Sequence, residues 1–553
     1  MATREGAGQG LLANPTVRIL FIFVAGMFAF ALAFSVLEGI SFFDAIYWAI
    51  TTCSTVGYGD LSPSNPLSKV LTMFVMVSGV ALLGYLLSTV SEKIVSLNMS
   101  RMMGLSRVKL SDHVIIAGWN TVARIALDEL LETDKDIVVV DTEQQPEVAD
   151  GKRVHFVLGD YQDEDTLQKA GITAADAIIL AMESDSEVVL GISAIRKVNK
   201  TVTIVGRIDD LDFAEVALNA GCDRVVSPSE VGGNMLFSAL SEPSVVRWFQ
   251  EASLANCGIE LTDFQASKIV AGGKRLEEIE LPSNQWIIGL DKETNLQVLA
   301  LPDKSERIGE NDTLVVLFRK ELTANGCEST RKAKPVESGD VLIVGWNPTV
   351  RSCVNELLAA QRYTVTVLSN DIPISEQEHY SEAGITFINR DISKLSLTKA
   401  LAKHDESVNI IVGIEEDASA ILTSHIIRGI KKKSNLIVRI DETSNHDAAH
   451  NALANQIVSP SAIGGRLLAH GVGKPSSVSW IMDATTASFG ADVAQMSVSE
   501  TGLAEKTVKS FSCPGRYVVV AIERADGTLE TMPSPDDPVH DGDTLIYIQV
   551  KES

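Results

Sequence analysis

The sequence predicts a chain of two parts: an α-helical membrane domain with two spans, followed by a cytoplasmic α/β part. The α/β part is expected to contain two repeats, each a doubly wound parallel sheet with a smaller α+β lobe behind it. Three observations predict this fold class. Two long apolar segments lie within the first hundred residues. The remaining residues, about 440, contain no further apolar segment of that length. This later part contains the same series of sequence motifs twice.

The two apolar segments are expected to cross a membrane, with both chain termini in the cytoplasm. They cover about residues 17–37 and 66–95, and each is long enough for a bilayer core of about 30 Å. The first exceeds the apolar core of a cleaved signal peptide, so we expect it to be retained. Arg4 precedes the first span and Arg18 lies at its start, while Lys93 lies at the end of the second span and Arg101 follows it, which places these flanks in the cytoplasm. Gly79 and Gly84 in the second span are either hinges or close-packing points.

The residues between the spans predict a potassium-selective pore. A short apolar helix is expected over 42–52, and it leads into Thr55-Val56-Gly57-Tyr58-Gly59. A potassium filter replaces the water shell of K⁺ with rings of backbone carbonyls, and Gly57 and Gly59 supply the backbone conformations that this requires. Irregular backbone at membrane depth is tolerated only where it is buried in protein or lines a water-filled cavity. The pore helix and filter are therefore placed at 42–60, with K⁺ as the permeant ion.

Four landmarks recur in the same order and show that the cytoplasmic part is a duplication. Val-Ile-Ile-Ala-Gly-Trp-Asn at 114–120 returns as Val-Leu-Ile-Val-Gly-Trp-Asn at 341–347, and Glu129-Leu-Leu returns as Glu356-Leu-Leu. Ser-Pro-Ser followed by Gly-Gly at 227–233 returns at 459–465, and Asp-Thr-Leu at 312–314 returns at 543–545. Two copies indicate paired domains rather than a solenoid.

Each repeat is expected to open as a Rossmann-like lobe. Short apolar runs alternate with helical patterns, and in the first repeat strands are expected at 114–117, 137–140, 154–158, 177–180 and 202–205, with a helical stretch from 228 to about 252. The domain boundaries that we expect are as follows: N-terminus 1–16, pore domain 17–98, linker 99–111, first repeat 112–330 (Rossmann lobe to about 230, C-terminal lobe about 253–330), linker 331–338, and second repeat 339–553 (Rossmann lobe to about 462, C-terminal lobe about 480–553).

Composition restricts the partners. A net charge of −25 argues against nucleic acid and fits a soluble body that attracts cations. The six cysteines show no CxxC pairing and are expected to be reduced thiols rather than a disulfide framework or zinc site.

The filter motif and the repeats together resemble the prokaryotic ligand-gated potassium channels with RCK (regulator of K⁺ conductance, TrkA-type) domains, and within them those with two RCK domains per chain. The resemblance covers about residues 17–553. It implies a homotetramer in the lipid of the bacterial inner membrane, with a gating ring of eight RCK domains. It also implies that ligand binding changes the ring and that residues 98–111 transmit this change to the pore.

A nucleotide site is predicted in the first repeat. Gly118, Trp119, Asn120 and Thr121 open a helix whose N-terminus favours an anion, although Asn120 replaces the second glycine of the usual motif. Asp141 lies where an acid is expected for ribose hydroxyls, Thr142 follows it, and Arg124 lies one helical turn from the loop. The family resemblance adds Asp160 on the adenosine side. The ligand expected is an adenine nucleotide such as NAD or ADP, and the alternative is a purely structural lobe.

The second repeat keeps only part of this pattern. Gly345, Asn347 and Arg351 remain, while Pro348 begins the helix and Val350 replaces the third glycine. The acid at the strand end has become Ser369-Asn370. The residues expected to contact phosphate are therefore kept, whereas the acid expected to contact the ribose hydroxyls is not.

A divalent cation such as Ca²⁺ is a further expected ligand. Asp209-Asp210 and the matching pair Asp441-Glu442 follow the fifth strand of each repeat, and carboxylates suit hard cations. Acids at a helix N-terminus can equally be solvated side chains favoured by the helix dipole. The competing acidic clusters are Asp160, Asp163, Glu164 and Asp165, and Glu183, Asp185 and Glu187. His446 and His450 have zinc-ligand spacing but no evident third ligand.

Two other functions were weighed against a channel. A membrane-tethered NAD-dependent oxidoreductase leaves the filter segment unexplained and lacks an obvious catalytic base, so no enzyme activity is expected. A regulatory subunit of a K⁺ transporter predicts no ion flux from this chain alone.

Overall fold

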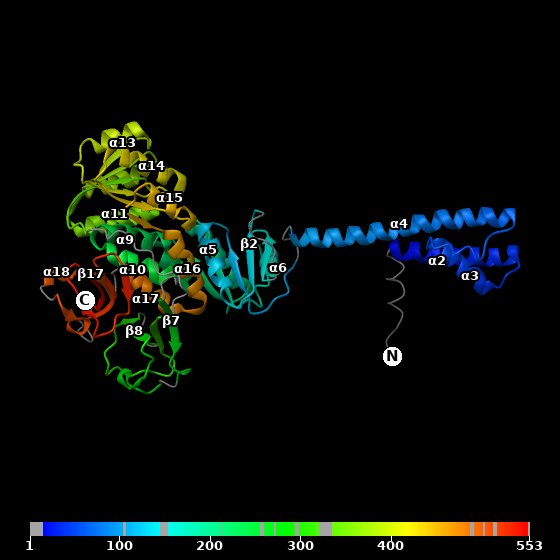
Figure 1. Ribbon diagram of the computed structural model, residues 1–553, viewed down its shortest axis with the longest axis horizontal. Helices are drawn as coiled ribbons and strands as arrows, with labels where there is room; N and C mark the ends of the chain where they lie inside the picture. Colours follow the sequence, from blue (N-terminus) through cyan, green and yellow to red (C-terminus); the bar gives the residue numbers. More distant parts are fainter. Residues whose placement is uncertain are drawn as a thin grey trace. The chain divides into compact units, whose positions relative to one another are not determined.

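The computed structural model describes residues 15–102, 107–143, 153–210, 212–254, 259–269, 272–292, 298–319, 335–486, 491–501, 504–511 and 517–550. The chain forms two compact units, residues 1–103 and 104–553 (Figure 1). Most of the expected N-terminus and parts of both linkers lie outside the described residues, as do Cys257, Cys327 and Cys513.

Over residues 15–102 the first unit contains three helices, α2 (Pro15–Glu38), α3 (Phe42–Cys53) and α4 (Pro66–Met102). They agree with the two predicted apolar spans and with the short helix predicted at 42–52, whose role in a pore stays a prediction. Both α2 and α4 are long and apolar enough to cross a membrane, over Phe21–Glu38 and Pro66–Thr89. With 37 residues α4 is about 55 Å long, so it extends well beyond its apolar part.

The short helix α3 is fixed between the two long ones. Ala45, Trp48 and Ala49 of α3 are buried with Phe34 of α2 and Val75 of α4. The rings of Phe34 and Trp48 stack with their centroids 3.6 Å apart. On the other side of the helices large apolar side chains are exposed, as lipid or a second subunit would require.

Glu38 ties the end of α2 to the start of α4. Its carboxylate accepts backbone N–H bonds from Ser64 (2.9 Å) and Asn65 (3.1 Å), and it also accepts hydrogen bonds from the Ser64 and Ser68 hydroxyls. The Glu38 carboxylate therefore joins the two ends of the segment that carries α3 and the predicted filter.

The second unit contains two six-stranded parallel sheets in the order 3-2-1-4-5-6, the doubly wound order. The first is built from β1 (Val114–Ala117), β2 (Ile137–Asp141), β3 (Val154–Leu158), β4 (Ala177–Leu180), β5 (Thr203–Arg207) and β6 (Arg224–Val226). The second is built from β11 (Gly339–Val344), β12 (Tyr363–Ser369), β13 (Thr386–Asn389), β14 (Asn409–Val412), β15 (Asn435–Arg439) and β16 (Gln456–Val458). The five strands predicted for the first repeat are confirmed, because fully apolar runs such as β1 and β4 are buried on both faces.

Helices connect these strands in both repeats. In the first they are α5 (Thr121–Leu131), α6 (Glu164–Lys169), α7 (Asp185–Val198) and α8 (Asp212–Asn219). In the second they are α11 (Pro348–Ala360), α12 (Ile374–Glu382), α13 (Lys394–Leu401), α14 (Asp417–Ile430), η2 (Thr443–Asn445) and α15 (His446–Asn451).

The helical stretch predicted after Ser227 is two helices rather than one. α9 (Pro228–Ser241) and α10 (Pro243–Leu254) divide at Glu242, because Pro243 disfavours helical backbone in the residue before it. The second repeat divides in the same way into α16 (Pro460–Gly473) and α17 (Pro475–Thr486) at Lys474.

Each repeat ends in a small lobe with a four-stranded sheet, in agreement with the predicted α+β lobes. The first sheet has the order β7-β10-β8-β9 and the second β17-β22-β19-β20. The elements are β7 (Ile259–Gln265), η1 (Leu276–Glu278), β8 (Gln285–Asp291), β9 (Leu299–Ala300) and β10 (Thr313–Arg319), then β17 (Ala491–Ser497), α18 (Val498–Thr501), β18 (Lys506–Thr507), η3 (Val508–Ser510), β19 (Tyr517–Glu523), β20 (Leu529–Thr531), β21 (Pro538–Val539) and β22 (Thr544–Val550).

The two repeats share one hydrophobic core. α9 of the first repeat packs along α11 of the second, while α16 of the second packs along α5 of the first (Figure 1). Gly232 and Gly464, the first residues of the repeated Gly-Gly pairs, permit a close approach of α9 to α16. A Cβ on Gly232 would lie 2.5 Å from Cβ of Pro460, and one on Gly464 would lie 2.5 Å from Cβ of Pro228. The Ser-Pro and Gly-Gly landmarks therefore face each other across a pseudo-twofold axis.

Candidate functional site

The predicted filter follows α3 as irregular backbone. The N–H groups of Val56 and Gly57 both donate to the carbonyl of Thr51, at 3.0 and 3.1 Å. Gly57 (φ 51°) and Gly59 (φ 79°) adopt the left-handed conformation that glycine reaches without a Cβ clash. Thr55 has φ 62°, which is uncommon for a β-branched residue. The Tyr58 side chain is 72% exposed in the single chain.

The two candidate hinge glycines in α4 differ in their surroundings. A Cβ on Gly79 would lie 2.8 Å from Cα of Cys53, so Gly79 allows α4 to pack tightly on the end of the pore helix. A Cβ on Gly84 would have nothing within 4 Å. The contacts favour packing at Gly79, and a hinge at Gly84 stays a prediction.

In the first repeat the predicted nucleotide residues meet at the carboxyl edge of the sheet. Gly118 has φ +84°, and a Cβ there would lie 3.1 Å from Met182. Asn120 caps α5: its Oδ1 accepts from Ala123 N–H at 3.0 Å and its Nδ2 donates to the carbonyl of Ala181. Asp141 accepts the Trp119 N–H at 2.7 Å, so the loop and the end of β2 are joined.

The remaining predicted residues of this repeat lie at the same edge. Asp141 also accepts the N–H of Glu143 at 2.8 Å, and Thr142 lies between these two residues. Asp160 follows β3, is exposed, and accepts the N–H of Gln162 at 2.8 Å. The sequence-predicted residues thus lie at the same edge of the sheet, but no ligand role is tested by these contacts.

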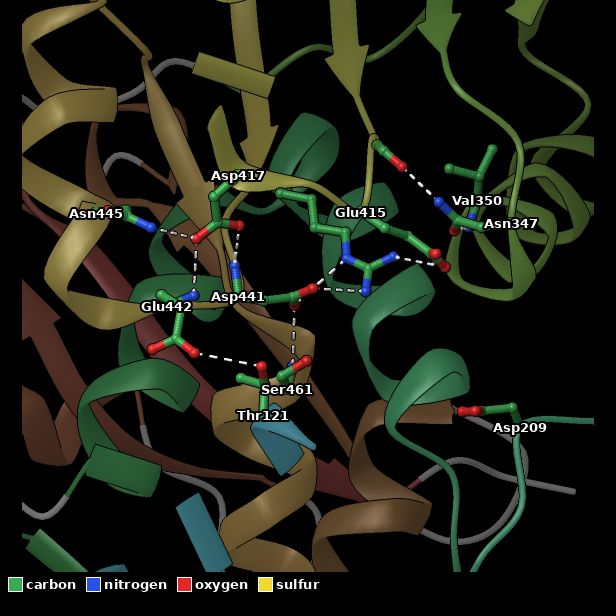
Figure 2. Close-up of polar contacts among 12 residues, drawn as sticks. Thr121, Asp209, Asn347, Val350, Glu415, Asp417, Asp441, Glu442, Asn445 and Ser461 are labelled. Carbon is green, nitrogen blue, oxygen red and sulfur yellow. Dashed lines mark hydrogen bonds and ion pairs between the residues drawn. The ribbon is translucent and has the colours of Figure 1, made fainter. Parts of the chain in front are cut away.

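A carboxylate of the second repeat lies at the N-terminus of α5. Glu442 accepts a hydrogen bond from the hydroxyl of Thr121 at 3.2 Å (Figure 2). Its carboxylate also forms an ion pair with Arg124. Arg124 also lies 3.6 Å from Asp128. Sequence reasoning named Glu442 only as one of two adjacent acids. Its position opposite Arg124, more than 300 residues away along the chain, was not predicted.

At the corresponding edge of the second repeat, side chains of that repeat bind one another. Trp346 donates its indole N–H to Glu376 at 2.6 Å and packs edge-on against Tyr380 and Phe387. Arg351 pairs with Glu376 at 3.0 Å.

The loop that begins at Gly345 in the second repeat is likewise held by contacts within this repeat. Asn347 caps α11 through the N–H of Val350 at 3.0 Å and donates to the carbonyl of Gly413 at 2.5 Å (Figure 2). A Cβ on Gly413 would lie 2.3 Å from Cγ2 of Val350, so this valine fills the space beside the loop of Gly345. Ser369, at the end of β12, is buried and supplies no carboxylate.

The acids after the fifth strands are held in place by other carboxylates. Asp185 accepts the N–H groups of Asp209 and Asp210, both at 2.8 Å, and Asp417 accepts those of Asp441 and Glu442 at 2.9 and 3.0 Å (Figure 2). Burial raises the pKa of Asp185, although these two N–H donors act in the opposite direction.

One member of each acidic pair is neutralised within its own repeat. Asp209 pairs with Arg207 at 2.6 Å, and Asp441 pairs with Arg439 at 2.7 Å. Asp210 instead faces Arg351 of the other repeat at 3.9 Å, the counterpart of the contact between Glu442 and Arg124. Within the part of the chain that the structure describes, no three His, Cys, Asp or Glu side chains form a metal-binding group. The metal role of Asp209 and Asp210 therefore stays a prediction.

The histidine pair of α15 is used structurally. His446 lies 2.8 Å from the Ser459 hydroxyl, and burial lowers its pKa, with the neighbouring His450 acting in the same direction.

Comparisons with known proteins agree with both units. The ion-channel family matches residues 17–96, and the TrkA-N domain family matches residues 114–228 and 341–460. The calcium-gated potassium channel TvoK of Thermoplasma volcanium is 26% identical over 289 residues, which cover 50% of this chain and 82% of TvoK. Probable potassium channel protein 2 of Methanocaldococcus jannaschii is 26% identical over 302 residues, covering 53% and 82%.

Solved structures show the same fold along nearly the whole chain. The GsuK channel bound to NAD has a TM-score of 0.51 and 19% identity, and the match covers 97% of each chain. The human SLO3 gating ring has a TM-score of 0.57 and 12% identity, and covers 80% of this chain and 99% of that one. The chain belongs to the ion channels that carry TrkA-N domains, and it combines one channel domain with two such domains. The relatives are channels rather than enzymes, which removes the oxidoreductase interpretation.

Proposed function

We propose that this chain is the subunit of a ligand-gated, K⁺-selective channel. The observation that carries the proposal is the Thr55–Gly59 segment, which follows a pore helix between two helices of membrane-spanning length. Rings of backbone carbonyls are the means by which such a segment selects K⁺. The relatives named as potassium channels support the same ion.

The proposed assembly is a homotetramer in the bacterial inner membrane, with both termini in the cytoplasm. One chain supplies a single filter segment, whereas a ring of carbonyls needs several copies around one axis. The exposed apolar faces of α2 and α4 fit contacts with lipid and with other subunits. Four chains would bring eight TrkA-N domains together as a gating ring.

Reconstitution of the purified chain alone tests the channel proposal. In planar bilayers with unequal KCl and NaCl solutions, we expect a reversal potential close to that of K⁺. Gly57→Val should abolish selective current, because a β-branched residue resists the left-handed backbone at this position. Gly26→Val in α2, where a Cβ would meet nothing within 4 Å, is the control and should keep selectivity. Absence of flux from the reconstituted wild-type chain would favour a regulatory subunit of a K⁺ transporter instead.

The first regulatory ligand that we propose is an adenine nucleotide such as NAD or ADP, bound to the first repeat. The support is local: a left-handed Gly118, a capped helix N-terminus and Asp141 at the end of β2 lie at one edge of the sheet. The solved relative bound to NAD has the same fold. The second repeat is the weaker candidate, since Trp346, Glu376 and Arg351 bind one another across its crevice.

The second regulatory ligand that we propose is a divalent cation, Ca²⁺ being the one named for a relative. A cavity of about 500 Å³ between the repeats is lined by five acids, Asp209, Asp210, Asp212, Glu230 and Glu376, and by Arg351. Because Asp209 is already paired with Arg207, Asp210 is the better ligand of the predicted pair. A cation bound by Asp210 would compete with Arg351 for its carboxylate.

A further inference from the structure

The chain enters the first repeat through a short segment that is docked onto the body of that repeat. This entry segment, residues 107–112, leads directly into β1. The N–H of Val108 donates to the carbonyl of Lys169 at 2.8 Å, and the N–H of Asp112 donates to that of Ala174 at 2.9 Å. The Val108 side chain packs against a hydrophobic core of the repeat. The entry segment is therefore bound to the turn that follows α6.

His113, the residue after the entry segment, is a buried histidine with one of its two ring nitrogens bonded. The side chain is fully buried, and its Nε2 lies 2.9 Å from the carbonyl oxygen of Ala170. A carbonyl can only accept, so Nε2 carries the proton. Nδ1 is buried and has no partner in the described part of the chain. A second proton on this ring would place a charge and an unbonded N–H away from water, which is costly, so the site favours the neutral ring.

The groups that face His113 do not remove this cost. Burial lowers the pKa of His113. The bond to Ala170 and the charges of Asp136 and Asp112 act in the opposite direction, while His155 acts in the same direction as burial. The net effect is a pKa below the ordinary value of histidine.

The other charged side chains on the elements packed around His113 have contacts of their own or are exposed. Lys169 pairs with Asp165 at 2.6 Å, Lys135 pairs with Asp176 at 2.8 Å, Arg107 donates to Gln168 at 3.2 Å, and Lys109 is exposed. None of these contacts supplies an acceptor for Nδ1.

The second repeat provides an internal comparison. His113 precedes Val114 and Asp340 precedes Val341 in the repeated landmark, so the two residues hold equivalent positions. Asp340 is exposed, and its carboxylate lies 3.2 Å from Nδ1 of His404. The fold therefore does not require a buried histidine at this position. It is found in the repeat that the chain enters from the membrane unit.

We propose that His113 is an acid-sensitive anchor of the entry segment, so that a second proton on its ring favours release of residues 107–112 from the first repeat. In the released state the ring reaches water, which accepts from both N–H groups. The docked state binds this proton less well than the released state, so docking is firm at neutral pH. It weakens as the pH falls through about 6.5, near which an exposed histidine gains its proton. An effect of release on the pore would rest on the proposed channel function, whereas release itself does not.

Amide hydrogen exchange of the full-length chain in lipid nanodiscs tests the release without any need for ion conduction. Exchange is followed by mass spectrometry at two pH values and divided by the intrinsic rate at each, which gives the protection of each peptide. From about pH 7.5 to about pH 5.5, protection of residues 107–112 should fall by up to about tenfold, because a released histidine is hardly protonated at the first value and mostly protonated at the second. Residues 336–339, which lead into the second repeat and are bonded to Leu240 and Arg362, are the internal control and should show no such fall.

His113→Gln keeps an amide that can donate to the carbonyl of Ala170 but cannot gain a proton, so its protection should be the same at both pH values. His379→Gln, at an exposed histidine of the second repeat, is the matched control and should keep the pH dependence of the wild type. Thermal unfolding shows whether each variant is folded. If His113→Gln is not, the contrast between residues 107–112 and 336–339 in the wild type decides alone. The proposal is overturned if residues 107–112 keep the same protection at both pH values, if residues 336–339 lose as much, or if folded His113→Gln shows the fall of the wild type.

Discussion

Glu442 shows at the scale of single residues how one repeat can control the other. Its carboxylate lies at the N-terminus of α5, bonded to Thr121 and Arg124, where a phosphate of the proposed nucleotide would bind. An anion that binds there must compete with an anion that the protein already supplies. Because Glu442 belongs to the second repeat, this contact would make the affinity of the first repeat for nucleotide depend on the position of one repeat relative to the other.

Glu442→Gln should strengthen nucleotide binding to the first repeat. The two side chains of the ion pair are about one-third exposed, so the pair is worth at most about 1 kcal/mol and the gain in affinity is about fivefold or less. Calorimetry with NAD and ADP in calcium-free buffer measures it. Asp141→Ala should weaken this affinity. A Glu442→Gln protein that binds more weakly than wild type would contradict the competition.

Asp483 makes the stability of the chain depend on pH. Burial in α17 raises its pKa to about 6, from an ordinary value near 4. Between these values the folded protein holds a proton that the unfolded chain has lost, so stability falls as pH rises from about 4 to about 6. Asp483→Asn removes this cost and should stabilise the protein by roughly 1–3 kcal/mol at pH 7, but hardly at pH 4. The difference in unfolding midpoint between variant and wild type at the two pH values tests this, and equal differences would contradict it.

At the scale of elements, the Gly-Gly pairs of α9 and α16 set the distance between the repeats. A Cβ on Gly233 would lie 2.4 Å from Cβ of Ser352 and 2.6 Å from the carbonyl of Thr349, so α9 and α11 would have to separate. Gly233→Ala should cost about 1–3 kcal/mol of stability through this overpacking. Gly429→Ala in α14, where a Cβ meets nothing within 4 Å, should be neutral or slightly stabilising. Thermal unfolding of both variants decides between a steric effect and a general effect of replacing helical glycine.

The elements themselves could be predicted from sequence, but their contacts could not. Runs such as Val114–Ala117 are apolar throughout, and only a strand buried on both faces requires that pattern. The division at Pro243 was missed, although the proline is a local signal for it. The pairing of Asp209 with Arg207 was also within reach, because the residues lie two apart across a strand end. The approach of Glu442 to Arg124 depends on how two distant repeats pack, and no local pattern encodes that.

At the scale of the whole molecule, two equivalent contacts link the repeats, Arg124 with Glu442 and Arg351 with Asp210. A nucleotide at the first contact and a cation at the second would each replace a bond between repeats by a bond to ligand. Both ligands then act on the same arrangement of the ring, and each must change the affinity for the other by the same factor. A ligand with equal affinity for both arrangements would change nothing.

We therefore expect calcium and nucleotide each to change open probability and each to shift the other's apparent affinity. Channels in planar bilayers, titrated with nucleotide at zero and at millimolar calcium, provide the measurement. Asp210→Asn should remove the effect of calcium and keep that of nucleotide, because it weakens the proposed cation ligand without touching the crevice of Gly118 and Asp141. Since calcium acts through Asp210 in this scheme, the two titration curves of the variant should coincide while those of the wild type separate. Coinciding curves in the wild type would remove the cation from the gating scheme and leave the nucleotide as its only ligand.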